Sequence, residues 1–315
     1  MKVKLTEASP DGILLIDKDE GKTSFDAVRM IRKILRCKKT GHAGTLDPFA
    51  TGLLIILLGQ GTRLSPYIMG GKKKYRAEIS LGIETDTCDP TGTVISEAPV
   101  PDMGVENIAE AISSFTGVIE QVPPVFSALK VNGQRAYNFA RKGIEVELKK
   151  REVTVYSIDI IDIRMPLITI EVSCSGGTYV RSLASDIGKK LGTVAHLRNL
   201  RRLSSGLFSV DNAMTIKDID SVGSEAMLNR IIPLHKSLPD MKTVELDNHL
   251  AEKIRNGYRP SWEELAENIE STDIDNGYMK LVSSSSLVAV MEIERSSTRK
   301  KNWLKKLKVF NLVFK

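Results

Sequence analysis

The sequence predicts a mixed fold of helices and strands, followed by a smaller β-rich domain at the C-terminal end. Helical spacing of apolar residues alternates with short apolar runs along most of the 315 residues, a length that fits more than one domain. Two consecutive segments, near 152–164 and 167–174, have the pattern of strands. Prolines mark a linker near 232–242, and residues 278–294 beyond it alternate as two strands.

The first elements follow from capping residues and periodicity. Residues 11–17 (DGILLID) predict a short buried strand, and a turn then leads into a helix with Thr23 or Ser24 as its N-cap. Apolar residues recur at helical spacing over 25–34 with basic residues between them, which indicates an amphipathic helix. The apolar run 53–58 fits a strand or a helix, and its length favours a strand.

The middle of the chain adds further helices and a strand. Helices are predicted over 62–69, over 103–116 and around 136–141. Residues 75–81 alternate as a half-buried strand does. Residues 82–93 (GIETDTCDPTGT) are polar and rich in turn residues, and their acids lack the glycine and glutamate placement of a calcium loop. We therefore expect a surface loop there.

A strand-to-helix junction is predicted at residues 174–192 (CSGGTYVRSLASDIGKKLG). The segment indicates a strand, a glycine turn and a helix from about Tyr179, with Tyr179 and Arg181 at the junction. Functional side chains concentrate on loops at the ends of rigid strands, so these two residues are candidates for a site. In the last part of the chain, residues 244–257 indicate a helix ahead of the two strands.

Basic residues gather in three clusters. The net charge is +6, and residues 29–39, 72–76 and 295–315 are rich in Lys and Arg; the last cluster carries eight such residues and no acid. Any one cluster fits a solvated face, but three of them favour an extended polyanion as the partner. Residues 126–143 interleave basic and aromatic side chains, which suits RNA contact and equally suits an amphipathic helix with its rings packed inward.

Composition argues against several other classes of protein. The N-terminus lacks the apolar core and cleavage pattern of a signal peptide, and no run reaches the roughly 20 apolar residues that span a bilayer. The three cysteines and four histidines are dispersed, so neither a disulfide framework nor a zinc site is indicated. We therefore expect a cytoplasmic protein with no metal site and no membrane association.

One stretch, residues 41–54 (GHAGTLDPFATGLL), surrounds the carboxylate of Asp47 with glycines and Pro48. Asp before Pro suits a helix N-cap. The same stiff turn also suits a catalytic carboxylate that acts as base or nucleophile. A metal site lacks partners, and glycosidase-type chemistry needs a second carboxylate that is not evident nearby. A close arginine, for which Arg181 is the candidate, would lower the pKa of Asp47 and orient it.

This stretch closely resembles the signature of the TruB-type tRNA pseudouridine synthases. The resemblance continues, in the family's order, through Lys74-Tyr75, LGIETDTCDPTG, VPPVFSALKVNGQRAYNFARKG, SCSGGTYVRSL and AHLRNLRRL. It covers roughly residues 11–240. Residues 244–315 resemble more loosely the PUA domain that follows the catalytic domain in this family.

The resemblance implies an α+β catalytic domain over residues 1–240, with a mixed, largely antiparallel sheet and flanking helices, and a small β-rich, PUA-like RNA-binding domain over 241–315. It implies that the T-loop uridine of tRNA (position 55) is isomerised to pseudouridine without a cofactor, after the base has been flipped out. The T arm of tRNA would be the partner of a monomer that needs no guide RNA or protein partner.

The resemblance also implies roles for individual residues. Asp47 is expected to start the reaction at the ribose, by attack or by deprotonation, with Arg181 paired to it. Tyr75 would stack on the target base and assist the late proton transfer from C5. Tyr179 and Leu200 would line the pocket.

A further residue, His42, would help to open the T loop and occupy space left by displaced bases, as the resemblance implies. Two other functions stay open. An RNA-binding and refolding factor would use the basic clusters equally well. The catalytic subunit of an RNA-guided particle shares GTLDP-like motifs, although GHAGTLDPFATGLL and SALKVNGQRAY favour the stand-alone bacterial type.

Overall fold

The structure is a computed structural model that describes residues 10–127, 129–131, 134–135, 139, 144, 148–266, 277–295 and 302–310. Its helices are α1 (Ser24–Ile34), α2 (Ser65–Met69), α3 (Val105–Ser113), α5 (Val180–Lys190), α6 (Ile216–Leu228), α7 (Asn248–Arg255) and α8 (Trp262–Ala266), with 3-10 turns η1 (Gly59–Leu64), η2 (Val210–Asn212) and η3 (Leu234–Lys236). None of the helices within these ranges is long and apolar enough to cross a bilayer.

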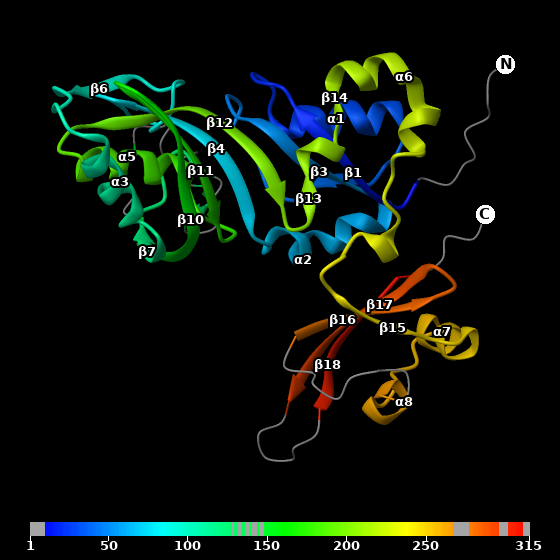
Figure 1. Ribbon diagram of the computed structural model, residues 1–315. Coiled ribbons are helices and arrows are strands. Elements are labelled where there is room, and N and C mark those ends of the chain that lie inside the picture. Colours follow the sequence, from blue (N-terminus) through cyan, green and yellow to red (C-terminus); the bar gives the residue numbers. More distant parts are fainter. Residues whose placement is uncertain are drawn as a thin grey trace.

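A large sheet crosses the upper part of the molecule (Figure 1). Its strands run in the order β14 (Met214–Thr215), β1 (Gly12–Lys18), β3 (Thr51–Leu58), β12 (Ala195–Ser205), β4 (Lys73–Leu81), β11 (Leu167–Cys174), β10 (Arg151–Arg164) and β7 (Gly117–Gln121). In addition, β2 (Thr40–His42) pairs with β3 and β13 (Phe208–Ser209) with β12. Among the described strand pairs of this sheet, β1–β14 and β3–β12 are parallel and the others are antiparallel, which confirms the mixed, largely antiparallel α+β fold.

Strand β3 is buried on both faces. Alternate residues of β1 and β3 pack under α1 and α6 on one side, and the intervening residues pack against η1 and α2 on the other. A strand that is covered on both faces has a continuous apolar run in its sequence, without alternation. The predicted strand over 53–58 is confirmed, because these residues lie in β3. Helix α1 begins as predicted: the Thr23 hydroxyl accepts from the backbone N–H of Asp26 in a capping box.

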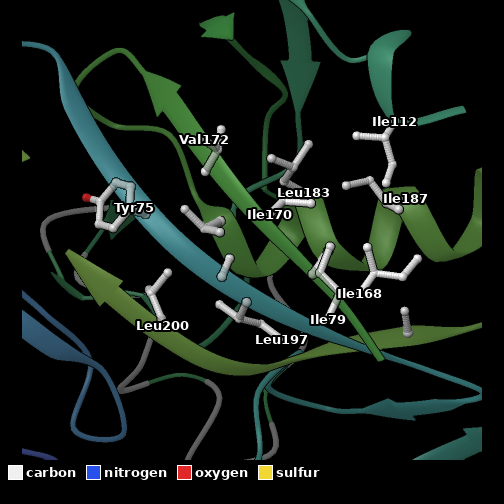
Figure 2. Packing of buried hydrophobic residues seen from close by; sticks show 14 of the residues in the cluster. Tyr75, Ile79, Ile112, Ile168, Ile170, Val172, Leu183, Ile187, Leu197 and Leu200 are labelled. Carbon is white, nitrogen blue, oxygen red and sulfur yellow. The ribbon is translucent and has the colours of Figure 1, made fainter. Parts of the chain in front are cut away.

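The other half of the sheet forms the largest buried cluster. Apolar side chains of β4, β11 and β12 pack beneath α5 and α3. Figure 2 shows Tyr75 and Leu200 together at one end of this cluster, with Ile112 and Ile187 at the other. The hydroxyl of Tyr75 points away from the aliphatic side chains, so the cluster fixes the ring while its oxygen stays outside the apolar packing.

Smaller pairs and a second sheet complete the chain. The pairs are β5 (Ile83–Thr85) with β6 (Val94–Glu97) and β8 (Lys130–Val131) with β9 (Gln134–Arg135). The second sheet has the order β15 (Lys242–Glu245), β16 (Gly277–Ser283), β17 (Ser286–Arg295) and β18 (Asn302–Val309), and it lies below α2 in Figure 1. Strands expected over 278–294 are therefore present, and part of the basic 295–315 cluster is itself a strand.

Three predicted elements differ from the structure. The expected helix over 62–69 is a 3-10 turn followed by the short helix α2. The expected surface loop 82–93 is partly buried, because Thr85, Thr87 and Asp89 are all less than one-tenth exposed. The helix expected around 136–141 lies outside the described residues, apart from Phe139.

Candidate active site

Asp47 lies in a turn, and no helix begins there in this described stretch. The backbone N–H of Ala50 donates to the Asp47 carbonyl over 3.1 Å, and β3 starts directly afterwards at Thr51. The helix-cap interpretation of Asp47 is therefore wrong. Its side chain is instead free to make contacts outside the turn.

Two buried side chains hold this turn against the end of β1. Lys18 is fully buried and donates to the carbonyls of Asp19, Lys22 and Pro48. Ser24 both accepts from and donates to the backbone of Leu46, at 2.9 and 3.1 Å. These contacts join the turn to the start of α1, so the backbone on both sides of Asp47 is fixed.

Arg181 binds the carboxylate of Asp47. Its Nε lies 2.9 Å from Oδ2 and its Nη2 donates to Oδ1 over 3.3 Å. The other N–H groups donate to the carbonyls of Thr87 and Phe126 and to Asp89. All five guanidinium donors are therefore used, which orients the buried arginine in a single way. The predicted approach of Arg181 to Asp47 is present.

Asp89 is a second carboxylate at the site, and it was not among the predicted site residues. It lies 3.1 Å from Nη1 of Arg181 and accepts from the hydroxyls of Thr87 and Thr91 and from the backbone of Thr91. The sequence carried one signal: Asp89 precedes a proline, as Asp47 does. The loop is polar because its threonines donate hydrogen bonds to this buried carboxylate. The same polar composition had indicated a surface loop.

The pKa of the Asp47 carboxyl is raised above its ordinary value of 3.8. Burial is the main cause and the nearby charge of Asp89 adds to it, while Arg181 and Lys18 oppose the rise. Arg181 lowers this pKa, as expected, but desolvation outweighs the ion pair and the net direction is upward. Arg181 still keeps the carboxylate oriented.

A cavity of about 400 Å³ opens beside this network. Five of the six candidate residues line it, namely Asp47, Tyr75, Tyr179, Arg181 and Leu200. The sixth, His42, lies on β2 opposite Ile56 and is absent from the described lining of the cavity. The structure therefore brings together candidate residues from four separate segments. It adds two cations that were not predicted as site residues, Lys73 and Arg202.

Each lining residue is held by its own element. Tyr75 on β4 is 8% exposed, and burial raises its pKa above the ordinary value of 10. Tyr179 is the N-cap residue of α5, and the Gln121 side chain both donates to its carbonyl and accepts from its N–H. Leu200 lies on β12 opposite Ala77 of β4, so its side chain is fixed by the sheet.

Family models match most of the sheet-bearing part of the chain. The N-terminal domain of the TruB family of pseudouridylate synthases matches residues 32–180. The tRNA pseudouridylate synthase B C-terminal domain matches residues 181–238. The junction between the two matches falls at Arg181, inside the site.

Several curated proteins named tRNA pseudouridine synthase B are similar to this chain. The one from Clostridium kluyveri is 48% identical over 78% of this chain and 84% of its own length. The one from Clostridium tetani is 41% identical over 86% of this chain and 92% of its own. The one from Geobacter sulfurreducens is 41% identical over 96% of this chain and all of its own length.

Solved structures share the fold. A chain in a Cbf5–Nop10–Gar1 complex has a TM-score of 0.72 at 25% identity and covers 95% of this chain and 84% of its own. A chain in an archaeal box H/ACA sRNP Nop10–Cbf5 complex has a TM-score of 0.70 at 24% identity, over 95% of this chain and 86% of its own. The similarity therefore extends into the C-terminal sheet.

Proposed function

This chain belongs to the TruB family of pseudouridylate synthases, and we propose that it isomerises the T-loop uridine of tRNA to pseudouridine with Asp47 as the nucleophile or base. The single observation that supports this role is the carboxylate of Asp47, held by buried Arg181, in the same cavity as Tyr75. A fixed carboxylate beside an aromatic ring suits a nucleoside whose base must be detached, turned and rejoined.

The reaction balances without an added redox partner. The bond between uracil N1 and ribose C1′ breaks, and its electron pair leaves with the uracil. Asp47 either attacks C1′ or removes the C2′ proton. The uracil then turns and its C5 bonds to C1′, as the bond between Asp47 and C1′ breaks or the proton returns to C2′. The proton on C5 is then lost while N1 gains one.

The remaining cavity residues fit this sequence of steps. The volume of about 400 Å³ is within the roughly 300–1,000 Å³ range of small-molecule pockets, so a flipped nucleoside can enter. Tyr75 would stack on the base, and its hydroxyl would assist the loss of the C5 proton. Tyr179 and Leu200 would confine the base. His42 would contact the displaced T loop outside the cavity.

The assignment of Asp47 is tested by tritium release from tRNA labelled at uracil C5. Wild-type protein should release tritium, and Asp47→Ala should release none while binding tRNA and melting as wild type does. Asp19→Asn is a matched control, because Asp19 is exposed and its carboxylate is not part of the cavity lining. Tritium release by Asp47→Ala at the wild-type rate would refute the role of Asp47, and no release by wild type from any tRNA would refute the function.

We propose that residues 241–315 form an RNA-binding domain next to the catalytic part, residues 1–240. A groove of about 540 Å³ runs between η1–α2 and the second sheet. Its lining includes four cations, namely Arg63, Arg255, Lys306 and Lys308. Burial and the neighbouring cations Arg63 and Lys306 lower the pKa of Lys308, so the groove is crowded with positive charge. A phosphodiester backbone would relieve this repulsion.

A second role as an RNA-binding and refolding factor is favoured by that groove, since it can hold RNA without any chemistry. Asp47→Asn separates the two roles. A strain with this variant that grows normally but lacks the pseudouridine would favour binding as the main function.

We further propose that the enzyme acts as a monomer without guide RNA or protein partner. Activity of the purified chain on bare tRNA would test the need for a partner, and sedimentation would test the oligomeric state.

A further inference from the structure

Two buried cations at the cavity lack a carboxylate partner within the described part of the chain. Arg202 is 1% exposed and Lys73 is 7% exposed, and both line the Asp47 cavity. The ion pairs of the described residues include neither of them. Burying a charge is costly unless something compensates it, so both positions require an explanation.

The fold directs Arg202 toward Tyr75. The two residues are direct neighbours on the antiparallel strands β12 and β4, so their side chains share one face of the sheet. The Arg202 Nε donates to the carbonyl of Leu53 over 2.6 Å, and Nη2 donates to the carbonyl of Gly44 over 3.2 Å. The Arg202 side chain also hydrogen-bonds the Tyr75 hydroxyl, which partly offsets the rise that burial causes in the pKa of Tyr75. The guanidinium is therefore held by two backbone carbonyls and by Tyr75, and no carboxylate of the described residues pairs with it.

Lys73 occupies the same strand as Tyr75, two residues earlier, and so lies on the same face. Its Nζ donates to the carbonyls of Met69 and Gly71, at 2.6 and 2.7 Å. These bonds use two of its three N–H groups. Burial, aided by Arg202, lowers the pKa of Lys73 to about 8. The ammonium remains mostly protonated at neutral pH.

The charges around the cavity do not balance. Three cations (Lys73, Arg181 and Arg202) stand against the two carboxylates Asp47 and Asp89. Arg181 is fully engaged by both carboxylates, so the excess positive charge is that of Lys73 and Arg202. Preorganised charge of this kind stabilises a ligand that becomes negative during the reaction.

We propose that Arg202, supported by Lys73, is a catalytic residue that stabilises the uracil anion formed when the N1–C1′ bond breaks. This inference rests on the proposed function. The electron pair of the broken bond stays on the detached uracil, where it is shared between N1 and the carbonyl oxygens. The cations hold that charge while the base turns, and the charge disappears when C5 bonds to C1′.

A substrate with a better leaving group tests this role. Fluorine at C5 makes uracil more acidic, so 5-fluorouracil needs less help to leave as an anion. Arg202→Gln should slow the loss of the target uridine by about 10²-fold in single turnover. The same variant should slow the loss of 5-fluorouridine, at the same position of the same RNA, by about tenfold or less.

Three further variants make the result decisive. Arg201→Gln is the control, because Arg201 is the neighbour of Arg202 on β12 but pairs with Asp17 away from the cavity, and both substrates should react normally. Arg202→Lys keeps the charge and should recover part of the rate. Lys73→Gln should show the same preference for 5-fluorouridine in weaker form, and it provides the test if Arg202→Gln fails to fold.

Equal slowing of both substrates by Arg202→Gln and Lys73→Gln would overturn the inference, since a purely structural role affects both leaving groups alike. A wild-type protein that converts no uridine would instead overturn the proposed function, and this inference with it. A wild type that converts uridine, together with unequal slowing in the variants, supports both.

Discussion

Arg181 binds Asp47 with two nitrogens, at 2.9 and 3.3 Å, while its third nitrogen is held by Asp89 at 3.1 Å. One buried guanidinium thus joins the turn after β2 to the loop before β6. The position of Asp47 consequently depends on a loop about forty residues away in the sequence.

We expect that lysine cannot replace Arg181. Arg181→Lys keeps the charge but removes the planar fork that contacts both carboxylates and two carbonyls. We expect single-turnover pseudouridine formation to fall by about 10²–10³-fold, with tRNA affinity changed far less. A rate within a factor of three of wild type would show that orientation by the fork is not required.

Asp89 should matter although it does not line the cavity that the described residues form. Asp89→Asn weakens one anchor of Arg181 and removes a charge that raises the pKa of Asp47. We expect a loss of turnover and a shift of the acid limb of the pH–rate profile to lower pH. The control is Asp86→Asn in the same loop, where the exposed carboxylate accepts only from the backbone of Thr93 among the described contacts. Identical profiles for Asp89→Asn and wild type would contradict the coupling.

Activity should require Asp47 ionised and Lys73 protonated. The raised pKa of Asp47 sets an acid limb above its ordinary value of 3.8, and the Lys73 pKa of about 8 sets an alkaline limb. Lys18, buried beside Asp47, has a pKa of about 8 as well. Lys73→Arg, which does not titrate in this range, should therefore move the alkaline limb upward if Lys73 is responsible. If the alkaline limb does not move, a group other than Lys73 causes it. Lys18→Arg is then the next variant to test.

Two glycines of the same stretch should respond differently to alanine. Gly52 has φ +98°, and a Cβ there would lie 2.3 Å from the carbonyl oxygen of Arg202. Gly41 leaves room, since its nearest neighbour would be a Thr62 methyl at 3.8 Å. Gly52→Ala should lower the free energy of unfolding by about 2–3 kcal/mol and Gly41→Ala by less than about 0.5 kcal/mol, as urea unfolding would measure. Equal effects would contradict the close β3–β12 approach.

The groove cations should control the salt dependence of tRNA binding. Lys306→Gln/Lys308→Gln should flatten the slope of log K against log salt by about one for each lost phosphate contact, and turnover at saturating tRNA should stay near wild type. This double variant replaces deletion of residues 295–315, which would remove strand β18 from the second sheet. Lys305→Gln is the control, because Lys305 lies outside the groove lining and contacts Glu292 and Glu294. An unchanged slope would exclude the groove from the RNA interface.

Much of the fold could be predicted from the sequence. The strand over 53–58, the helix over 24–34 and the strand-to-helix junction at Tyr179 are all present, because buried runs, caps and glycine turns act locally. Resemblance of short motifs further implied Asp47, Tyr75 and Arg181 as one site. The 82–93 loop was misjudged, since its threonines are polar in sequence yet buried around Asp89.

The sequence by itself predicted most of the strands and helices, and the resemblance of its motifs implied Asp47, Tyr75 and Arg181 as candidate site residues. Only the tertiary structure decided that Asp89 supports Arg181 and that Arg202 faces Tyr75 across two strands. It also decided that burial, and not the ion pair, sets the direction of the Asp47 pKa. The physical reason is that helix and strand propensity and helix capping depend on neighbouring residues in the sequence. Desolvation and strand register depend instead on residues that are distant in the chain.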